Sequence, residues 1–280
     1  MPESTDDARE RWALILGCSS GFGAATAIAL ARAGYAIAGV HLDLRSSQPQ
    51  AERVRQTIAE TGMPVVFHNV NAVDEAKRQA VVADVRARFE ARRAAGSEPF
   101  IAVFLHSLAF GVTRPYVSTD PARKEVNQRQ IEMTTDVMAH SMLYWTRDLF
   151  HAGLLARGSR VFAMTSEGAV KVVPTYGPVS AAKAALESHC RQLALELIPY
   201  GITVNAIRAG VADTPAARAI EGHEELFEYA RQRNPAGRMT RPEDVGEAIV
   251  ALASPRLYWM TGNTIGVDGG ELMGSRQAGE

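Results

Sequence analysis

A glycine-rich turn near the start of the chain constrains the fold more strongly than any other feature of the sequence. It follows the apolar run Ala13–Leu16, contains Gly17, Gly21 and Gly23, and leads into an alanine-rich segment that closes at Gly34. A short apolar run is typical of a strand buried on both faces, and the alanine-rich segment favours a helix. Strand, glycine turn and helix are the context of a dinucleotide-binding motif, so the chain is predicted to begin with a nucleotide-binding unit.

The residues of this turn have different expected parts in binding a dinucleotide. Gly17 permits the tight turn, Gly21 lets backbone N–H groups approach the pyrophosphate, and Gly23 lets the helix pack on the sheet. The helix N-terminus then faces the phosphates. The residues predicted to contact the cofactor here are Gly17, Ser19, Ser20, Gly21, Phe22 and Gly23. The glycine spacing is G-x-x-x-G-x-G rather than G-x-G-x-x-G, and its position before a second predicted strand supports the nucleotide-binding interpretation.

Strand-like and helix-like segments alternate along the rest of the chain. Apolar runs predict further strands at residues 35–40, 64–68, 100–105, 161–163, 202–207 and 265–267. Regular βαβ alternation implies a parallel sheet with right-handed crossovers and helices on both faces. We therefore expect an α/β fold with a doubly wound, Rossmann-type sheet in three layers.

The predicted elements fill nearly the whole chain of 280 residues, which is long enough for one large α/β domain. We expect a single dinucleotide-binding domain at residues 12–273, between a disordered N-terminal arm at residues 1–11 and a tail at residues 274–280. Residues 131–156 are predicted to form one long helix whose methionine and aromatic stripe is typical of a core or subunit interface. Residues 216–235 are interpreted as a mobile helical flap.

Composition excludes several classes of function. A net charge of −1 provides no electrostatic basis for binding nucleic acid or an anionic membrane surface. No apolar run approaches the roughly 20 residues needed to cross a bilayer, and the polar, acidic N-terminus is unlike a signal or transit peptide. The two cysteines, Cys18 and Cys190, fit a reducing compartment, and no Cys/His cluster has metal-ligand spacing. We therefore expect a cytoplasmic protein without a bound metal.

Polar side chains after the second, third and fourth predicted strands are candidates for binding the cofactor. Asp43 and Arg45 favour opposite choices, because a carboxylate binds the adenosine ribose hydroxyls and repels a 2′-phosphate, whereas an arginine does the reverse. Asp43 comes first and the glycine turn holds no basic residue, so NAD(H) is favoured over NADP(H). Asn69 and Val70 end the third strand, where they could meet the adenine, and Ser107 follows the fourth strand. Ligands of such sheets bind beyond the carboxyl ends of the strands.

Two further residues near strand ends allow more than one interpretation. Thr214 could hydrogen-bond a ligand amide, or could N-cap the next helix with Pro215 in its first position, and these interpretations are compatible. His106 is interpreted as a packed or hydrogen-bonded residue rather than as a base.

The candidate catalytic residues lie in one stretch, where a strand end is followed by a helix start. Ser166 supplies a hydroxyl, Tyr176 a phenol and Lys183 an ammonium. Tyr176 and Lys183 are 183 − 176 = 7 residues apart, which is roughly 10 Å along one face of a helix, so both could reach one ligand. A nearby ammonium stabilises a phenolate and is expected to lower the pKa of Tyr176 towards working pH. The alternative is a surface lysine and a packing tyrosine at a helix start.

Taken together, these motifs resemble the short-chain dehydrogenase/reductase superfamily over roughly residues 12–273. The resemblance rests on the Gly17–Gly23 turn, Ser166, Lys183, Asn205-Ala206-Ile207, Ala209-Gly210-x-x-x-Thr214 and Val267-Asp268-Gly269-Gly270. It implies a sheet of about seven parallel strands, a nicotinamide cofactor and a homotetramer or homodimer. It also adds Gly210 to the cofactor-binding residues and gives Lys183 a contact with the nicotinamide ribose.

Departures from the superfamily pattern narrow the resemblance. The usual Tyr-x-x-x-Lys would place tyrosine at position 179, which is Val179 here, and the available phenol is Tyr176. The position of the catalytic asparagine is Asp136. Tyr-x6-Lys is similar to the enoyl-acyl-carrier-protein reductases, as are His-Ser-Leu-Ala-Phe at 106–110, Asn-Ala-Ile-Arg-Ala-Gly at 205–210 and Asn-Pro-Ala-Gly-Arg-Met at 234–239. Gly-Val-x-Arg-Pro at 111–115 and Tyr-Ala-Arg-Gln at 229–232 are most similar to the third bacterial type. That type is associated with NADPH, but its cofactor-selecting arginine aligns with Asp43, so the NAD(H) preference is kept.

This resemblance implies reduction of the C2=C3 double bond of an enoyl thioester, of the fatty-acid-synthesis type, on a carrier protein or coenzyme A. Tyr176 would hydrogen-bond the thioester oxygen as enolate charge develops, Lys183 would keep Tyr176 acidic, and Ser166 would orient cofactor or substrate. One alternative is a carbonyl or alcohol (3-keto/3-hydroxy) oxidoreductase on the same fold. Val179 is evidence against this alternative, because the usual tyrosine is missing at that position. Another is a catalytically silent NAD(P)-binding sensor or scaffold, suggested by the rearranged catalytic residues.

Overall fold

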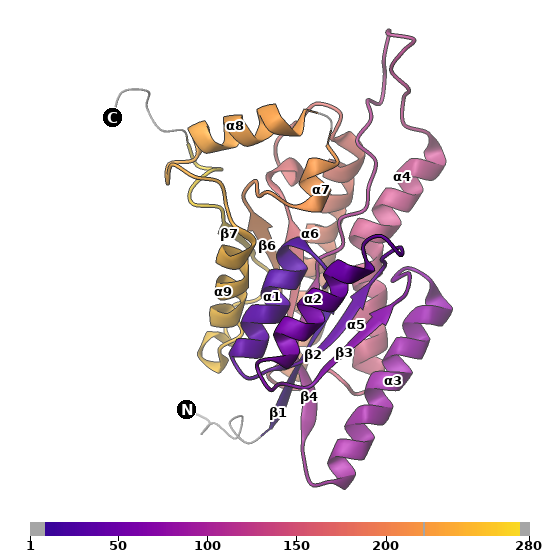
Figure 1. The fold of residues 1–280 in the computed structure, drawn as a ribbon, viewed down its shortest axis with the longest axis vertical. Helices are drawn as coiled ribbons and strands as arrows, with labels where there is room; N and C mark the ends of the chain where they lie inside the picture. Colours follow the sequence, from indigo (N-terminus) through magenta and orange to yellow (C-terminus); the bar gives the residue numbers. More distant parts are fainter. Residues whose placement is uncertain (1–8, 221, 275–280) are drawn as a thin grey trace.

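Seven parallel strands form one sheet in the computed structural model, which describes residues 9–220 and 222–274 (Figure 1). The strands are β1 (Glu10–Leu16), β2 (Ala36–His41), β3 (Val65–Asn69), β4 (Pro99–His106), β5 (Arg160–Thr165), β6 (Thr203–Ala209) and β7 (Thr264–Val267). Their order is β3-β2-β1-β4-β5-β6-β7, so the chain winds outward from β1 to β3 and then outward in the other direction from β4 to β7. The winding reverses between β1 and β4, and the predicted doubly wound sheet is confirmed.

Helices cover both faces of this sheet and complete three layers. They are α1 (Gly21–Arg32), α2 (Gln48–Ala59), α3 (Glu75–Ala94), α4 (Gln128–Thr135), α5 (Ser141–His151), α6 (Gly177–Leu197), α7 (Pro215–Arg218), α8 (His223–Arg233) and α9 (Pro242–Leu252). One buried cluster joins the sheet to α3, α5 and α6, and the other joins it to α1, α2 and α9. Alternate residues of β1 supply the two clusters, Leu14 to the first and Ile15 to the second, as expected for a strand buried on both faces.

The first strand begins earlier than the sequence indicated. Glu10 and Arg11 lie in β1 and not in the expected arm at residues 1–11, because pairing with β4 continues to Glu10. The Glu10 carboxylate accepts a hydrogen bond from Trp12 and pairs with Arg92 of α3, which holds this polar end of the strand in place. The rest of the expected arm before residue 9, and the tail after residue 274, lie outside the described residues.

The long helix expected at residues 131–156 is interrupted. It consists of α4, a five-residue π-helix at Asp136–His140 and α5, which ends at His151. A π-helical turn adds a residue to the local repeat and changes which side chains share a face, and such turns are frequent at functional sites. The buried side chains of α5 include Met142, Trp145 and Leu149, so the methionine and aromatic stripe contributes to the core.

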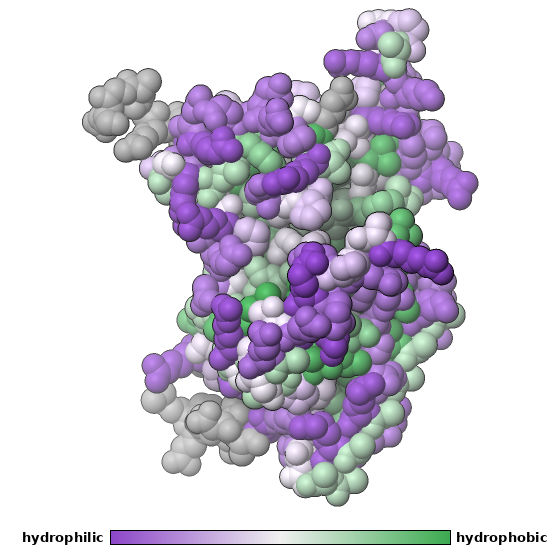
Figure 2. Space-filling model, in the orientation of Figure 1, coloured by the Kyte–Doolittle hydropathy of each residue, from purple (hydrophilic) through white to green (hydrophobic). Residues whose placement is uncertain are grey.

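The carboxyl ends of the strands and the loops that follow them lie at one end of the molecule, at the top of Figure 1. A long excursion between β4 and α4 rises from this end, and α7 and α8 lie across it. Figure 2 shows that the surface is hollowed between the part that carries α8 and the part that carries α1 and α2. No helix within residues 9–220 and 222–274 is both long and apolar enough to span a membrane.

Candidate active site

The glycine turn between β1 and α1 forms a cradle that has no room for side chains. Gly17 has a φ of +82°, and a Cβ atom at this position would overlap the carbonyl oxygen of Ser107 beyond β4. A Cβ atom at Gly23 would overlap the Gly17 carbonyl oxygen, and one at Gly21 would lie 3.3 Å from the Cγ2 atom of Thr214. The turn therefore brings together three of the segments predicted to bind the cofactor, namely those that follow β1, β4 and β6.

The start of α1 is suited to binding phosphate. Ser20 occupies the N-cap position, but its side chain accepts no capping hydrogen bond from the first turn of the helix. The N–H groups of that turn have no partner within a helix, and the positive end of the helix dipole lies in the same place. A close backbone approach and N–H groups at a helix N-terminus fit the pyrophosphate of a dinucleotide. This cradle could hold NAD(H) or NADP(H).

Thr214 takes the capping position that the sequence allowed. Its side chain accepts a hydrogen bond from the N–H of Ala217 at 3.2 Å, and Pro215 is the first residue of α7. Its methyl carbon faces Gly21, so the cap also lies at the edge of the cradle. Gly210 is the first residue after β6, where a Cβ atom would lie 2.6 Å from a carboxylate oxygen of Glu271.

Asp43 follows β2 and carries a fixed negative charge at the same end of the sheet. Its carboxylate accepts a hydrogen bond from His41 Nδ1 at 2.8 Å. Burial acts to raise the pKa of Asp43, but hydrogen bonds with Ser47, Ser19 and His41 hold the pKa below its usual value. The carboxylate is therefore ionised at neutral pH. Arg45 is exposed, two residues further along.

Asn69 is placed next to Asp43 by the pairing of β2 with β3. Its side-chain oxygen accepts a hydrogen bond from the backbone N–H of Asp43 at 2.9 Å, and its amide nitrogen donates to the Asp43 carbonyl at 2.9 Å. Asn69 thus binds the Asp43 backbone, a contact that the sequence did not suggest. The N–H of Val70 donates to the carbonyl of His41 at 2.8 Å, which extends the strand pairing by one residue.

Lys183 lies in the second turn of α6 with only 5% of its surface exposed. Its Nζ atom donates a hydrogen bond of 2.7 Å to the carbonyl of Met164 near the end of β5. Burial lowers the pKa of Lys183 to about 8, although the nearby Glu187 carboxylate acts in the opposite direction. The ammonium is therefore still the main form at neutral pH, with two further N–H donors for other partners.

Tyr176 immediately precedes α6, and its ring packs over Gly168. A Cβ atom at Gly168 would lie 2.7 Å from the tyrosine ring and 3.2 Å from the hydroxyl of Ser166. Burial raises the pKa of Tyr176 above its usual value, and a hydrogen bond with Ser166 only partly offsets this effect. The expectation that Lys183 lowers this pKa is therefore wrong for the chain without ligands, because burial dominates. Tyr176 is a neutral hydrogen-bond donor.

The position of Tyr176 depends on a strained residue. Thr175 has a φ of +62° and is the one residue other than glycine with a positive φ in the described part of the chain. This conformation is unfavourable for a β-branched residue and costs about 1–3 kcal/mol. Val179, at the usual position of the superfamily tyrosine, is instead buried, and a Cβ atom at Gly111 would lie 3.0 Å from it.

Asp136 and His106 do not join this group as acids or bases. Asp136 lies in the π-helical turn and hydrogen-bonds Tyr144, whose pKa is raised by burial and by the charge of Asp136. His106 is fully buried, with Nε2 at 2.8 Å from the Ser141 hydroxyl. Burial, together with the positive charge of Lys183, lowers the pKa of His106 to about 3, so it is neutral, in agreement with a packed and hydrogen-bonded role.

Two contacts near Tyr176 were missed by sequence reasoning. Arg233 of α8 donates a hydrogen bond of 2.6 Å to Glu167, the residue after Ser166, and so ties the expected flap to the loop before α6. Tyr116, in the excursion between β4 and α4, packs against Gly177, where a Cβ atom would lie 2.7 Å from its ring. One feature of the sequence could have indicated close packing in this region. Gly168 and Gly177 lie near the candidate Tyr176, and a glycine beside an aromatic ring often marks close packing.

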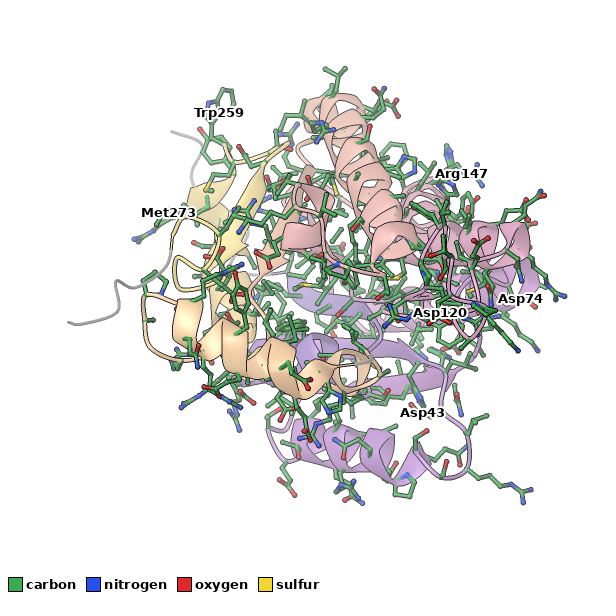
Figure 3. All side chains as sticks on the ribbon, turned by 90° about the horizontal axis from the view of Figure 1, so that it is seen from above. Asp43, Asp74, Asp120, Arg147, Trp259 and Met273 are labelled. Carbon is green, nitrogen blue, oxygen red and sulfur yellow. The ribbon has the colours of Figure 1, made fainter. Side chains whose placement is uncertain are left out.

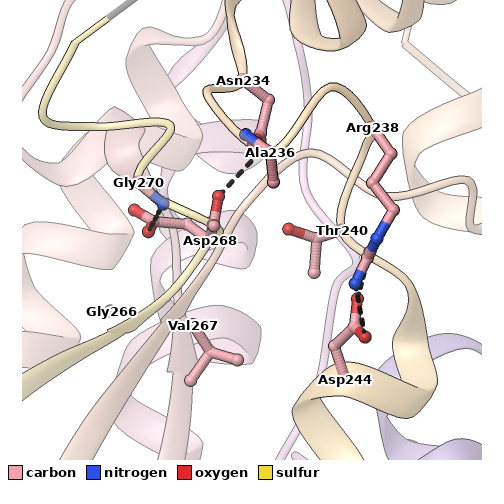
Figure 4. Close-up of a pocket in the computed structure, with 10 residues that line it drawn as sticks. Asn234, Ala236, Arg238, Thr240, Asp244, Gly266, Val267, Asp268 and Gly270 are labelled. Carbon is pink, nitrogen blue, oxygen red and sulfur yellow. Dashed lines mark hydrogen bonds and ion pairs between the residues drawn. The ribbon is translucent and has the colours of Figure 1, made fainter.

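A separate cavity of about 320 Å³ lies beyond the end of β7 (Figure 4). It is lined by Asn234, Ala236, Arg238, Thr240, Asp244 and residues 266–270. Asn234 donates to the carbonyl of Asp268 at 2.8 Å, and Arg238 forms two short contacts with the Asp244 carboxylate. Within the lining Arg238 pairs with Asp244, Asp268 faces Arg208 outside it, and the lining includes none of the predicted site residues.

Comparison with known proteins agrees with this architecture. A family model described as Enoyl-(Acyl carrier protein) reductase matches residues 17–271. The NADH-dependent enoyl-acyl-carrier-protein reductase FabI of Aquifex aeolicus is 33% identical over 173 residues, covering 61% of this chain and 63% of its own length. Cis-4-hydroxycyclohexanecarboxylate dehydrogenase of Sinomonas cyclohexanicum is 30% identical over 261 residues, covering 93% of this chain and 96% of its own length.

Solved structures extend the similarity to nearly the whole chain. The crystal structure of the NADH-dependent enoyl-acyl-carrier-protein reductase from Aquifex aeolicus VF5 superimposes with a TM-score of 0.79 at 26% identity. The superposition covers 94% of this chain and 96% of that chain. By sequence, however, the chain spans less than two thirds of the length of the Aquifex reductase that it matches.

Proposed function

Because this chain belongs to the short-chain dehydrogenase/reductase superfamily, in the family described as Enoyl-(Acyl carrier protein) reductase, we propose that it reduces the C2=C3 double bond of an enoyl thioester. Membership of the superfamily makes it an oxidoreductase that uses a nicotinamide cofactor. The choice of an enoyl substrate rests on the geometry around Tyr176.

The displacement of the phenol is the observation that carries this proposal. Val179 occupies the position of the usual superfamily tyrosine and is buried, with 3% of its surface exposed. The phenol comes instead from Tyr176, three residues earlier, beside Ser166 and before the helix that carries Lys183. In a 1,4-reduction the oxygen that gains charge lies two bonds further from the carbon that receives hydride than in reduction of a ketone. A displaced phenol suits that longer reach.

The bound nicotinamide would supply the hydride that is added at C3 of the enoyl group. Negative charge then develops on the thioester oxygen until a proton reaches C2. A neutral phenol is the donor that such an oxygen needs, and the raised pKa keeps Tyr176 protonated throughout the neutral range. Tyr176 would therefore stabilise the enolate by donating a hydrogen bond where charge appears.

Lys183 and Ser166 would support this donor in different ways. Lys183 uses one N–H group to bind the Met164 carbonyl, which leaves two donors for the hydroxyls of the nicotinamide ribose. Its positive charge would also favour negative charge on the nearby substrate oxygen. The Ser166 hydroxyl accepts a hydrogen bond from the N–H of Gly168 and lies close to the Tyr176 phenol, so it would hold the phenol in one orientation.

The cradle and Asp43 would choose the cofactor and hold it. The backbone around Gly21 would bind the pyrophosphate, and Thr214 and Gly210 would lie along the nicotinamide half. The ionised Asp43 would bind the adenosine ribose hydroxyls and repel a 2′-phosphate, so NAD(H) is the preferred cofactor in this proposal. The acyl group would be carried by a carrier protein or by coenzyme A.

A homotetramer or homodimer is part of the same proposal. Tyr258 and Trp259 are 56% and 81% exposed, and their rings contact each other at a centroid distance of 5.8 Å. Figure 3 shows Trp259 protruding from the side of the molecule. Large exposed aromatic side chains of this kind are typical of subunit contacts. Size-exclusion chromatography with light scattering tests the assembly, and a monomer at micromolar concentration would reject it.

Two other functions have specific support. A carbonyl or alcohol oxidoreductase is supported by the dehydrogenase relative, which matches over 96% of its own length. A catalytically silent NAD(P)-binding protein is supported by Asp136, which binds Tyr144 instead of joining the catalytic group.

Paired substrates separate these possibilities. Crotonyl-CoA and acetoacetyl-CoA are each mixed with the full chain and either NADH or NADPH, and absorbance is followed at 340 nm. We expect turnover of crotonyl-CoA, with NADH preferred. Turnover of acetoacetyl-CoA alone would reject the enoyl assignment in favour of the carbonyl reductase. Tight cofactor binding with no turnover of either thioester would favour the silent protein.

A further inference from the structure

Asp43 lies outside regular structure, yet both its backbone and its side chain are held. It is the second residue after β2, in the connection that leads to α2 at Gln48. Figure 3, which looks down on the carboxyl ends of the strands, shows Asp43 on this connection. A side chain at such a position ordinarily samples several rotamers, and ordering it on binding costs free energy. The contacts of Asp43 remove most of that cost in advance.

The backbone of Asp43 is held by Asn69. Asn69 is the last residue of β3 and is the register partner of His41. Its amide spans the N–H and the carbonyl of Asp43 with two hydrogen bonds of 2.9 Å each. One side chain thus satisfies both backbone groups of a residue that has left the sheet, and the path of the connection is fixed at Asp43.

The carboxylate of Asp43 is held by His41. The imidazole is 8% exposed, packs on Phe67 at a centroid distance of 5.6 Å, and places Nδ1 at 2.8 Å from Asp43 Oδ2. An ionised carboxylate only accepts hydrogen bonds, so Nδ1 carries the proton. Ser19 and Ser47 lie close enough to the carboxylate to help keep its pKa low. A carboxylate has about four acceptor positions, so with His41 bound it can still accept hydrogen bonds from ribose hydroxyls.

We propose that His41 and Asn69 are positioning residues that aim the Asp43 carboxylate at the adenosine ribose and thereby set the preference for NAD(H). The proposal rests on the cofactor choice in the proposed function and goes beyond it, because it assigns part of the selectivity to two residues that act through Asp43. With the carboxylate fixed, its charge stays beside the 2′ position and repels a phosphate there.

Release of the carboxylate would have a specific consequence. Arg45 is exposed, and its side chain makes no hydrogen bond or ion pair within residues 9–220 and 222–274. A mobile Asp43 could turn towards Arg45 or into solvent, and the arginine would then be the charge nearest to a 2′-phosphate. Loss of the clamp should therefore weaken NADH and spare NADPH.

Isothermal titration calorimetry of the full chain with NADH and NADPH tests this proposal without relying on turnover. His41→Phe keeps an aromatic ring against Phe67 and removes the donor, whereas His41→Asn keeps an N–H donor near the position of Nδ1. Because the lost hydrogen bond is made to a charged group, we expect His41→Phe to raise the Kd for NADH about tenfold or more. The Kd for NADPH should stay the same or fall, because a released carboxylate no longer repels the 2′-phosphate, and His41→Asn should restore most of the NADH affinity.

Asn69→Ala should also weaken the binding of NADH, since it removes the two hydrogen bonds that hold the backbone of Asp43. His68→Phe is the matched control, because His68 precedes Asn69 on the same strand and faces Asp84 of α3 instead of Asp43. Its ratio of NADPH to NADH dissociation constants should equal that of the wild type. For His68→Phe, kcat at saturating NADH should also remain within about twofold of the wild type.

Asp43→Ala separates failure of this inference from failure of the cofactor choice. If Asp43→Ala leaves the ratio of dissociation constants unchanged, the selection of NAD(H) by Asp43 is wrong. If it shifts the ratio while His41→Phe and Asn69→Ala do not, the cofactor choice stands and the clamp is wrong. Equal weakening of both cofactors by His41→Phe would also overturn the clamp. If His41→Phe does not fold, His41→Asn and His41→Gln replace it, because only asparagine places its donor near Nδ1.

Discussion

The two ends of the site are built on different principles. At the adenosine end, Gly17, Gly21 and Gly23 shape a cradle from backbone atoms, where a Cβ atom would overlap backbone at Gly17 and Gly23 and would lie 3.3 Å from Thr214 at Gly21. At the reactive end, Tyr176 is held by a strained neighbour and by packing on Gly168. The sequence signal of the first end lies in one local motif, whereas the surroundings of the second also include Tyr116 and the contact of Arg233 with Glu167, which are distant in the chain.

This difference separates two kinds of change. Substitutions at the adenosine end should alter which cofactor binds and how tightly, and should leave the chemistry of the bound complex unchanged. Removal of the phenol at the reactive end should alter the rate and leave cofactor affinity nearly unchanged. The predictions below test that separation, beginning with the largest expected effect.

Tyr176→Phe should reduce kcat for crotonyl-CoA by about 10²–10³, because loss of one donor to a developing oxyanion costs about 2.7–4 kcal/mol. The Kd for NADH, measured by titration calorimetry, should change by less than about twofold. Tyr258→Phe is the control, since Tyr258 is exposed and belongs to neither end. Equal rates for Tyr176→Phe and the wild type would remove the phenol from the chemistry.

Lys183 should impose an alkaline limit on activity. Its pKa is about 8, and the ammonium is the form that binds ribose hydroxyls, so kcat/KM should be constant below pH 8 and should fall tenfold per pH unit above it. Lys183→Arg stays charged over this pH range, so its kcat/KM should not fall above pH 8. Its rate at neutral pH should be lower than that of the wild type, because a guanidinium has a different shape. Lys124→Met, at an exposed position, should keep the wild-type profile. If Lys183→Arg shows the same fall in kcat/KM above pH 8, a group other than Lys183 causes that fall.

Asp43→Ser should change the choice of cofactor and little else. Loss of the charge that opposes a 2′-phosphate should lower the Kd for NADPH about tenfold, which corresponds to roughly 1.4 kcal/mol. The double variant Asp43→Ser/Arg45→Ala should lose this gain if Arg45 supplies the attraction. Fluorescence titration with both cofactors measures these dissociation constants. An unchanged preference between NADH and NADPH would show that Asp43 does not select the cofactor.

Thr175→Asn should have the smallest effect and should act on stability. Asparagine tolerates a positive φ better than a β-branched residue, so about 1 kcal/mol of strain should be relieved and Tm should rise by about 2 °C. Thr175→Val retains the branching and should show no rise. If calorimetry shows that Thr175→Asn is destabilising, the account of strain before Tyr176 is wrong.

The adenosine end could be predicted from sequence because its signals are local. The turn from Gly17 to Gly23, the strands on either side of α1 and the position of Asp43 all lie within residues 10–43. The parallel, doubly wound character of the sheet followed from βαβ alternation and the handedness of crossovers. What local sequence could not show was the contact of Asn69 with Asp43, because it joins residues 26 positions apart.

The reactive end was predicted in outline and missed in detail. The three residue types were found from the Tyr-x6-Lys spacing and the strand end at Ser166. The direction of the pKa shift of Tyr176 was wrong because burial, which depends on the whole fold, outweighs the expected charge effect. The π-helical turn at Asp136–His140 and the contact of Arg233 with Glu167 also arise only from tertiary packing. The catalytic roles themselves remain predictions.

A crystal structure of the chain with NAD⁺ and crotonyl-CoA tests the central claim most directly. The account predicts that the hydroxyl of Tyr176 lies about 2.5–3.0 Å from the thioester oxygen and that Lys183 Nζ binds the nicotinamide ribose. A Tyr176 ring turned away from the thioester, with another group on that oxygen, would contradict it.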